Sequence, residues 1–280
     1  MTIIDEQTDY RHVICSAFEH DSFFRHGNVI GYSKKDLLNK LQIAKEYVTE
    51  AQKFVMWQGV NNLTGEIMPV KEIGKLCHEH NAFYICDMTA MIGHAPIPTN
   101  IDQWCDCAVW SGHKLGTELG IGAMWLSDRL DKWLNGFKLH GTPNLAGALA
   151  LTQAVEDVVS AVEDNFQHWR RLRNSLEINL TMEEIDYSLV KWDDCPAILA
   201  IRLPGFNADA LQQYLASKQI YVSIGGSACA EKHDYRVLNA YGLSNDEASE
   251  VIRISFGENS SVEDVMVLVD GIVAFRKEYL

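Results

Sequence analysis

The sequence has little of what would tie a chain to a membrane or to nucleic acid. No apolar run approaches the roughly 18 residues of a membrane span, and the N-terminus shows no basic stretch followed by an apolar one. Acidic residues (38) outnumber basic ones (24), so the formal net charge is −14 and no basic surface for nucleic acid is expected. We therefore expect a soluble cytoplasmic protein that binds neither nucleic acid nor a membrane.

The cysteines also lack the pattern of a disulfide framework or a zinc site. Their number is odd, and they are scattered through strand-like and helical stretches, at positions 15, 77, 86, 105, 107, 195 and 229. Cys105 and Cys107 are spaced to lie on one face of a strand, and His78 and His80 follow Cys77, but no second ligand pair has zinc-finger spacing. We expect reduced thiols in a reducing compartment, and no metal.

Strand and helix patterns alternate in the first half of the chain. Helical patterns cover residues 35–51 and 69–80, and they separate apolar strand patterns at 12–17, 53–60, 82–87, 107–110 and 122–126. Such alternation predicts an α/β fold with a parallel sheet covered by helices.

The second half has a different organisation. A long helix is predicted over 144–181, with a basic, exposed stretch at 169–173. A mixture of strands at 197–203, 220–223 and 251–256 and helices at 208–217 and 262–277 follows. We predict a large domain over residues 1–164, which includes an interface helix, and a small α+β domain over residues 165–280.

Reactive side chains follow two of the predicted strands. Asp87 ends the strand at 82–87, and Ser111, His113 and Lys114 follow the strand at 107–110. The carboxyl ends of parallel strands line the ligand crevice, so these groups should face one pocket. A lysine can form a Schiff base with pyridoxal phosphate, an aspartate can keep the pyridine nitrogen protonated, and Ser111 and His113 can hydrogen-bond the phosphate. The alternatives are that Asp87 caps a helix that begins near Thr89 and that Lys114 is a solvated surface lysine.

Short motifs in the order of a known family extend this interpretation. They are His12-Val-Ile-Cys-Ser-Ala-Phe-Glu-His20, Val60-Asn-Asn62, Asp87-Met-Thr-Ala-Met-Ile-Gly93, Ser111-Gly-His-Lys114, Gly120-Ile-Gly-Ala123, Gly141-Thr-Pro-Asn144, Gly226-Ser-Ala-Cys229 and Ile252-Arg-Ile-Ser-Phe-Gly257. With these motifs the chain resembles the cysteine desulfurases, a branch of the class V aminotransferases. The resemblance implies a truncated pyridoxal-phosphate transferase fold type I, with pyridoxal 5'-phosphate as cofactor.

The resemblance also implies an activity and roles for individual residues. L-cysteine would give alanine and a persulfide on Cys229, whose glycine-rich approach and polar surroundings predict an exposed loop. Lys114 would be the Schiff-base lysine. His20, expected at a strand end in Phe18-Glu19-His20, would stack on the cofactor and transfer protons. Asn62 would lie near the cofactor's phenolic oxygen. Arg253 would bind the substrate carboxylate, since its guanidinium fork matches that group; the alternative is an internal salt bridge.

Thr142 resembles a threonine that reaches the cofactor phosphate of a partner subunit, which implies a homodimer. Several family features are missing, however. The usual acidic residue after Asn62 is Leu63, the usual glutamine is Ala90, and the usual arginine is Leu139. The glycine-threonine turn that cradles the phosphate has no counterpart before residue 12, and residues 20–34 leave little room for the family's helix and edge strand.

Several functional alternatives therefore stay open. The chain could be an active, minimised desulfurase that passes sulfur to an acceptor protein, for iron–sulfur cluster assembly or tRNA thiolation. It could be one part of a split enzyme, with a second chain supplying the phosphate turn. It could also be a non-catalytic relative, or another class V enzyme such as a selenocysteine lyase or an aminotransferase. Only Cys229 argues against the aminotransferase.

Overall fold

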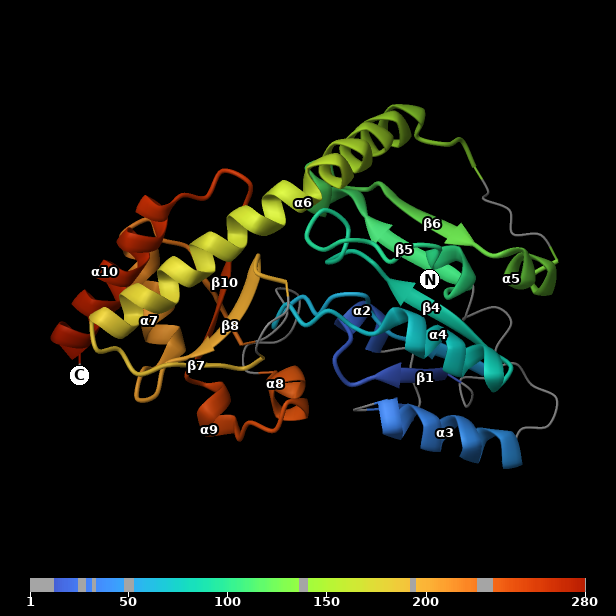
Figure 1. Cartoon of the computed structure of the whole chain (residues 1–280), viewed down its shortest axis with the longest axis horizontal. Coiled ribbons are helices and arrows are strands. Elements are labelled where there is room, and N and C mark those ends of the chain that lie inside the picture. Colours follow the sequence, from blue (N-terminus) through green and yellow to red (C-terminus); the bar gives the residue numbers. More distant parts are fainter. Residues whose placement is uncertain are drawn as a thin grey trace. The chain divides into compact units, whose positions relative to one another are not determined.

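The computed structural model describes residues 13–24, 29–31, 34–47, 53–135, 141–191, 195–225 and 234–279. The chain divides into two compact units (Figure 1). Unit 1 comprises residues 1–60 and 67–162, and unit 2 comprises residues 61–66 and 163–280. The short segment 61–66 thus belongs to the unit formed by the C-terminal part of the chain, which the sequence did not predict.

Unit 1 is built on a mainly parallel sheet, as predicted. Its strands are β1 (Val13–Ser16), β2 (Val29–Gly31), β3 (Lys53–Met56), β4 (Ala82–Asp87), β5 (Cys107–Ser111) and β6 (Gly122–Leu126). Their order is β2-β1-β3-β4-β5-β6, and only the β5–β6 pair is antiparallel. The carboxyl ends of β1, β4 and β5 therefore lie at one edge of the sheet, together with the start of β6.

Helices cover both faces of this sheet. They are α2 (Asp21–Phe24), α3 (Lys34–Tyr47), α4 (Val70–Glu79) and α5 (Asp128–Trp133), with the 3-10 helices η2 (Ile101–Gln103) and η3 (Gly112–Leu115) between strands. Phe83 and Ile85 of β4 pack in one cluster with Leu130 of α5. Tyr84 and Cys86 lie on the opposite face, and both are fully buried. Burial on both faces explains why this strand is an uninterrupted apolar run.

Two short elements correct the expectation for residues 20–34. The structure has both a helix and an edge strand there, although the sequence was judged too short for them. The helix α2 is a single turn, and β2 pairs in parallel with β1 through Ile14–Val29, Cys15–Ile30 and Ser16–Gly31. Elements of four and three residues fit because each relies on tertiary contacts, with Phe23 of α2 in the sheet's core cluster.

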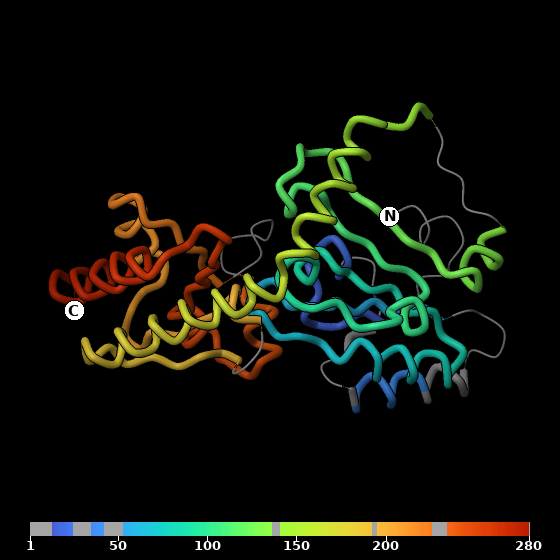
Figure 2. Tube along the Cα trace, turned by 45° about the horizontal axis from the view of Figure 1, so that its top comes forward, coloured from blue at the N-terminus to red at the C-terminus, as the bar shows by residue number. Residues whose placement is uncertain are grey.

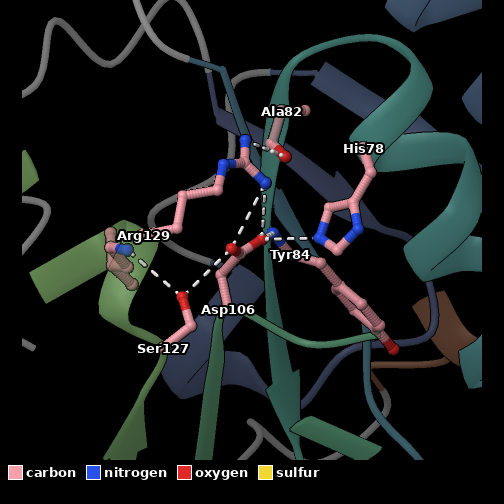
Figure 3. A network of polar contacts seen from close by, with 7 residues as sticks. His78, Ala82, Tyr84, Asp106, Ser127 and Arg129 are labelled. Atoms are coloured by element: carbon pink, nitrogen blue, oxygen red, sulfur yellow. Dashed lines mark hydrogen bonds and ion pairs between the residues drawn. The ribbon is translucent and has the colours of Figure 1, made fainter. Parts of the chain in front are cut away.

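A buried carboxylate holds the opposite, amino-terminal edge of the sheet (Figure 3). Asp106, just before β5, accepts hydrogen bonds from the Tyr84 N–H at 3.0 Å, the Ser127 hydroxyl at 3.2 Å and Arg129 Nη1 at 3.2 Å. His78 Nε2 of α4 lies 3.3 Å from the same carboxylate. Burial tends to raise the pKa of Asp106, but these hydrogen bonds and the charge of Arg129 outweigh it and lower the pKa.

Replacing this carboxylate should destabilise unit 1. Asp106→Asn keeps the shape but leaves Arg129 without its counter-charge, so we expect a loss of about 3 kcal/mol in the free energy of unfolding. Because the folded-state pKa is lowered, the wild-type stabilisation is present above about pH 4 and is lost as the pH falls further. Urea unfolding at several pH values measures both effects. Asp102→Asn, at an exposed position of η2, is the matched control, and equal stability of the two variants would contradict the assignment.

The helix α6 (Leu145–Met182) continues from unit 1 into unit 2. Contrary to the expectation from apolar runs, it is long and apolar enough to cross a membrane by length and composition, although a single helix of this kind is weak support for a span. The prediction of an exposed stretch at 169–173 is wrong in part, because Trp169 and Arg173 are buried. The Trp169 indole donates to the Gly257 carbonyl at 2.9 Å, and Arg173 pairs with Glu177 at 2.9 Å.

Unit 2 has an antiparallel sheet with helices. Its strands β7 (Ser188–Leu189), β8 (Ile198–Arg202), β9 (Ser223–Ile224) and β10 (Val251–Ser255) have the order β7-β8-β10-β9. The helices after α6 are α7 (Ala208–Ser217), α8 (Arg236–Ala240), α9 (Asn245–Ala248) and α10 (Val262–Tyr279). Figure 2 shows α10 running beside the C-terminal half of α6, where Arg276 donates to the carbonyls of Glu183 and Glu184.

Candidate active site

A pocket lies at the carboxyl edge of the unit 1 sheet. Its volume is about 400 Å³, which is within the range of small-molecule sites. Four parts of unit 1 line it: α2, the end of β4, the end of β5 and the start of β6. The lining residues are Ser22, Phe23, Asp87, Thr89, Val109, Trp110, Ser111, Gly120, Ile121 and Gly122. Parallel strand ends thus meet at one pocket, and the start of the antiparallel β6 joins them.

Asp87 is the acidic group of this pocket. Its Oδ1 accepts the Thr89 N–H at 2.9 Å, so the carboxylate holds the turn that follows β4. The helix expected near Thr89 is absent from these described residues; they form turns, because the N–H groups of Met91 and Ile92 both bond the Met88 carbonyl. Burial raises the pKa of Asp87, while the Thr89 hydrogen bonds and the nearby charge of His20 partly oppose that rise.

His20 lies four positions after β1 ends, not at a strand end as the sequence suggested. The chain makes a turn over residues 17–19 and then enters α2, where the N–H groups of Phe23 and Phe24 donate to the His20 carbonyl. The Ser22 N–H donates to His20 Nδ1 at 3.3 Å, and the Ser22 hydroxyl lies 2.9 Å from the same nitrogen. Because a backbone N–H can only donate, Nδ1 must accept, and the neutral imidazole has its proton on Nε2.

Lys114 lies on η3, immediately after β5. The turn that leads to it is tight: a Cβ added at Gly112 would lie 2.4 Å from Thr117 Oγ1. Lys114 is exposed, and its positive charge adds to burial in lowering the pKa of His94, a residue of the turn after Asp87. The lysine ammonium is therefore near the segment that leaves β4.

Ser111 and His113 form a hydrogen-bonded pair beside this lysine. The Ser111 hydroxyl and His113 Nδ1 are 2.8 Å apart. Ser111 lines the pocket, whereas His113 is exposed and is not among the lining residues. Both groups can bind an anion, which suits a phosphate at this edge of the sheet.

The residues at this edge fit pyridoxal phosphate. Asp87 is a half-buried carboxylate with a raised pKa; a cation opposite it would favour its charged form, and a protonated pyridine nitrogen would supply one. An exposed lysine amine is available for the aldehyde, and the Ser111 hydroxyl for the phosphate. Asp87 and Ser111 line the pocket, and Lys114 lies on η3 directly after β5 without lining it, so this edge of the sheet carries the donor set that the cofactor requires.

Arg253 and Asn62 both belong to unit 2. Arg253 Nη1 donates to the Asn62 carbonyl at 3.1 Å, and Nη2 donates to the Ser223 hydroxyl at 2.9 Å. The internal salt bridge considered for Arg253 is not formed with any described carboxylate, and its buried Nε has no hydrogen-bond partner among these residues. Leu63, which replaces the usual acidic residue, is buried in an apolar cluster that includes Leu238.

Cys229 lies outside the described residues. Thr142 is exposed and precedes α6 by three positions.

Sequence reasoning missed the serine and threonine residues that hold the site residues. Ser22 and Thr89 follow His20 and Asp87 by two positions, a spacing typical of local side-chain turns, so a signal was present. Ser223 contacts Arg253 across 30 positions of sequence, through strand register. That register was not readable from the chain.

The fold and the pocket define a pyridoxal-phosphate-dependent transferase of fold type I, which confirms the predicted fold class. The family model for aminotransferase class-V matches residues 7–268. The chain therefore belongs to the class V aminotransferases, whose cofactor is pyridoxal 5'-phosphate, and within them it is cysteine desulfurase-like.

Curated relatives and solved structures agree with this assignment. The cysteine desulfurase IscS of Ehrlichia chaffeensis is 27% identical over 296 aligned positions, which cover 99% of this chain and 70% of that protein. The IscS of Clostridium botulinum is 28% identical over 84% of this chain but only 62% of its own length. The X-ray structure of a NifS-like protein from Rickettsia africae has a TM-score of 0.81 and 21% identity, covering 98% and 78% of the two chains. At that identity the structural likeness shows the fold alone.

Proposed function

We propose that this chain is a cysteine desulfurase that removes sulfur from L-cysteine and leaves alanine and a persulfide on Cys229. The observation that supports it best is the placement of His20, Asp87 and Lys114 at one edge of the unit 1 sheet, where they follow β1, end β4 and follow β5. A non-catalytic binding protein would have no need of a proton-transfer imidazole, a half-buried acid and an exposed lysine at one edge of a sheet.

The bound cofactor would supply an aldehyde for amine chemistry and an electron-accepting ring. Asp87 holds negative charge against the ring nitrogen, Lys114 provides the amine, and Ser111 and His113 bind the phosphate. His20 presents Nε2–H as the proton that it exchanges, because Nδ1 already accepts from Ser22.

The substrate would be held through its carboxylate by Arg253, with Asn62 beside it. The Cys229 thiolate attacks the cysteine sulfur; a sulfur–sulfur bond forms as the Cβ–sulfur bond breaks, and Cβ takes a proton to complete alanine. The other cysteines are poor candidates, since Cys15, Cys77, Cys86, Cys105, Cys107 and Cys195 are all buried. Burial raises the pKa of the Cys107 thiol to about 12, for example, which keeps it protonated.

A homodimer is part of the proposal. The first turns of α6 expose Leu145 and Leu149, which are 69% and 73% accessible and lie on one helix face. Thr142 lies three positions before this face, so a second copy covering it would bring Thr142 to the partner's cofactor. A sulfur-acceptor protein, and a second chain that supplies a phosphate turn, are further proposed partners, and the cytoplasm is the proposed compartment.

Thr142→Val should weaken cofactor retention about fivefold to tenfold without changing the dimer's mass in solution. The substitution keeps the shape of the side chain and removes only the hydroxyl that would bond the partner's phosphate. Cofactor dialysis and light scattering measure the two quantities. Thr152→Val, which removes an exposed hydroxyl on α6, is the matched control. A monomer that retains the cofactor fully would exclude the shared site.

The proposal is tested by incubating the cofactor-loaded protein with L-cysteine. Equal amounts of alanine and sulfide are expected in the presence of a reductant, with one added sulfur atom on the peptide that contains Cys229. Turnover of selenocysteine alone would favour a lyase, and amino transfer to a keto acid would favour an aminotransferase. Cofactor binding without any turnover would favour a non-catalytic relative, while activity only with a second chain would favour a split enzyme.

A further inference from the structure

Arg253 occupies an interior position of the unit 2 sheet. It lies on β10, between β8 and β9, and its direct cross-strand neighbours are Ala200 and Ser223. Ala200 offers no polar atom, so Ser223 is the only polar side chain among these two neighbours. A guanidinium placed there gives up hydration and must find its hydrogen bonds within the protein.

The partners that Arg253 finds are neutral. The Ser223 hydroxyl and the Asn62 carbonyl accept from Nη2 and Nη1, at 2.9 Å and 3.1 Å, and Nε stays without a partner among the described residues. Arg129, Arg173 and Arg202 differ in this respect, because each pairs with a carboxylate at 3.2 Å or less. Arg276 is half-buried like Arg253, and it too donates to neutral groups, the carbonyls of Glu183 and Glu184.

Neutral acceptors orient a guanidinium but leave its charge uncompensated. A carboxylate at position 223 would neutralise the charge and compete with any anionic ligand, whereas a hydroxyl does neither. The segment 61–66 supports the second acceptor, because Glu66 accepts from Tyr241 at 2.5 Å and pairs with Lys191 at 2.7 Å. Gly65, at a φ of +78°, brings this segment against Ile198, where a Cβ would lie 2.3 Å from the Ile198 carbonyl oxygen.

We infer that Ser223 is a positioning residue, which holds the Arg253 guanidinium through a neutral hydrogen bond so that it can bind the α-carboxylate of an amino-acid substrate. The inference rests on the proposed function, which uses Arg253 in this way, and it adds Ser223 as the group that sets orientation and keeps the site cationic. Asn62 accepts through its backbone carbonyl, which a side-chain substitution does not remove. Substitution of Ser223 is therefore the direct test.

The test compares Ser223→Ala, Ser223→Thr and Ser223→Asp in the cofactor-loaded full chain. Calorimetry measures binding of L-alanine, which has the carboxylate, and of ethylamine, which lacks it. Removing a hydrogen bond to a charged group should weaken L-alanine binding about tenfold in Ser223→Ala, with little change for ethylamine. Ser223→Thr retains the hydroxyl and should restore binding, while Ser223→Asp should weaken it about a hundredfold by pairing with Arg253. With cysteine as substrate, the Ser223→Ala defect should lie in KM.

Each outcome decides the inference. Unchanged L-alanine binding in Ser223→Ala, a threonine variant as weak as the alanine variant, or an aspartate variant as strong as the wild type would overturn it. So would a wild-type protein that does not distinguish L-alanine from ethylamine. Sulfide release by the wild-type protein reports separately on the proposed function. If the wild-type protein releases sulfide but substitutions at position 223 leave L-alanine binding unchanged, the proposed function stands and only the role of Ser223 is refuted.

Discussion

Lys114→Ala should abolish covalent attachment of pyridoxal phosphate. Lys114 lies on η3 at the carboxyl edge of the sheet, where its charge acts on His94 in the turn after Asp87, and its side chain is exposed. Removing the amine leaves Asp87, Ser111 and His113 in place, so non-covalent binding of the cofactor should persist in a weakened form. Turnover of cysteine should fall by at least about a thousandfold, since the role proposed for Lys114 is to supply the amine that attaches the cofactor.

Borohydride reduction followed by peptide mapping tests this prediction by locating the lysine that carries the pyridoxyl group. In the wild-type protein, the pyridoxyl group should appear on the peptide that contains Lys114 and nowhere else. The control is Lys75→Ala, which removes a lysine of α4 that lies over the Trp104 ring at 5.5 Å and should not alter labelling. Labelling at Lys34 or Lys35 in the wild-type protein would show that the alignment of the cofactor motifs is wrong.

Strong local patterns predicted much of the fold. The strands at 82–87 and 122–126 and the helix at 208–217 have the predicted bounds, because apolar runs and helical periodicity report burial directly. The one-turn α2 and three-residue β2 were missed, since elements this short have no period to detect. The partial burial of the stretch 169–173 was missed because Arg173 offsets its charge with Glu177, a pairing that exposure patterns do not anticipate.

In the candidate site, too, local patterns predicted some residues, whereas other features depend on tertiary structure. Asp87 and Lys114 were recognisable because each follows an apolar run that ends in a charged group. The tautomer of His20 depends on the Ser22 N–H. The hydrogen bond from Arg253 to Ser223 depends on the register of β9 with β10. Register is a tertiary property, since a slip of one residue would place Ser223 on the other face of the sheet, and no local pattern encodes it.

Cys229→Ser should eliminate sulfur transfer while leaving cofactor binding intact. A serine hydroxyl is far less nucleophilic toward sulfur than a thiolate, and it cannot hold a persulfide. We therefore expect sulfide and alanine formation to fall to background, with no added sulfur on any peptide of the variant. The visible spectrum should still respond to L-cysteine, because Asp87, Lys114 and Arg253 are unchanged and the substrate amine and carboxylate still find their partners.

The matched control is Cys195→Ala, which removes a buried thiol from the C-terminal part of the chain and should keep the added sulfur on the peptide of Cys229. Mass spectrometry after cysteine treatment, together with sulfide assays, compares the two variants. Persistent sulfide release by Cys229→Ser would make this cysteine incidental, and a lyase acting by elimination would then replace the desulfurase. Loss of the spectral response along with sulfide release would instead place the defect in substrate binding. The persulfide mechanism thus requires that the two readouts separate in Cys229→Ser and stay together in Cys195→Ala.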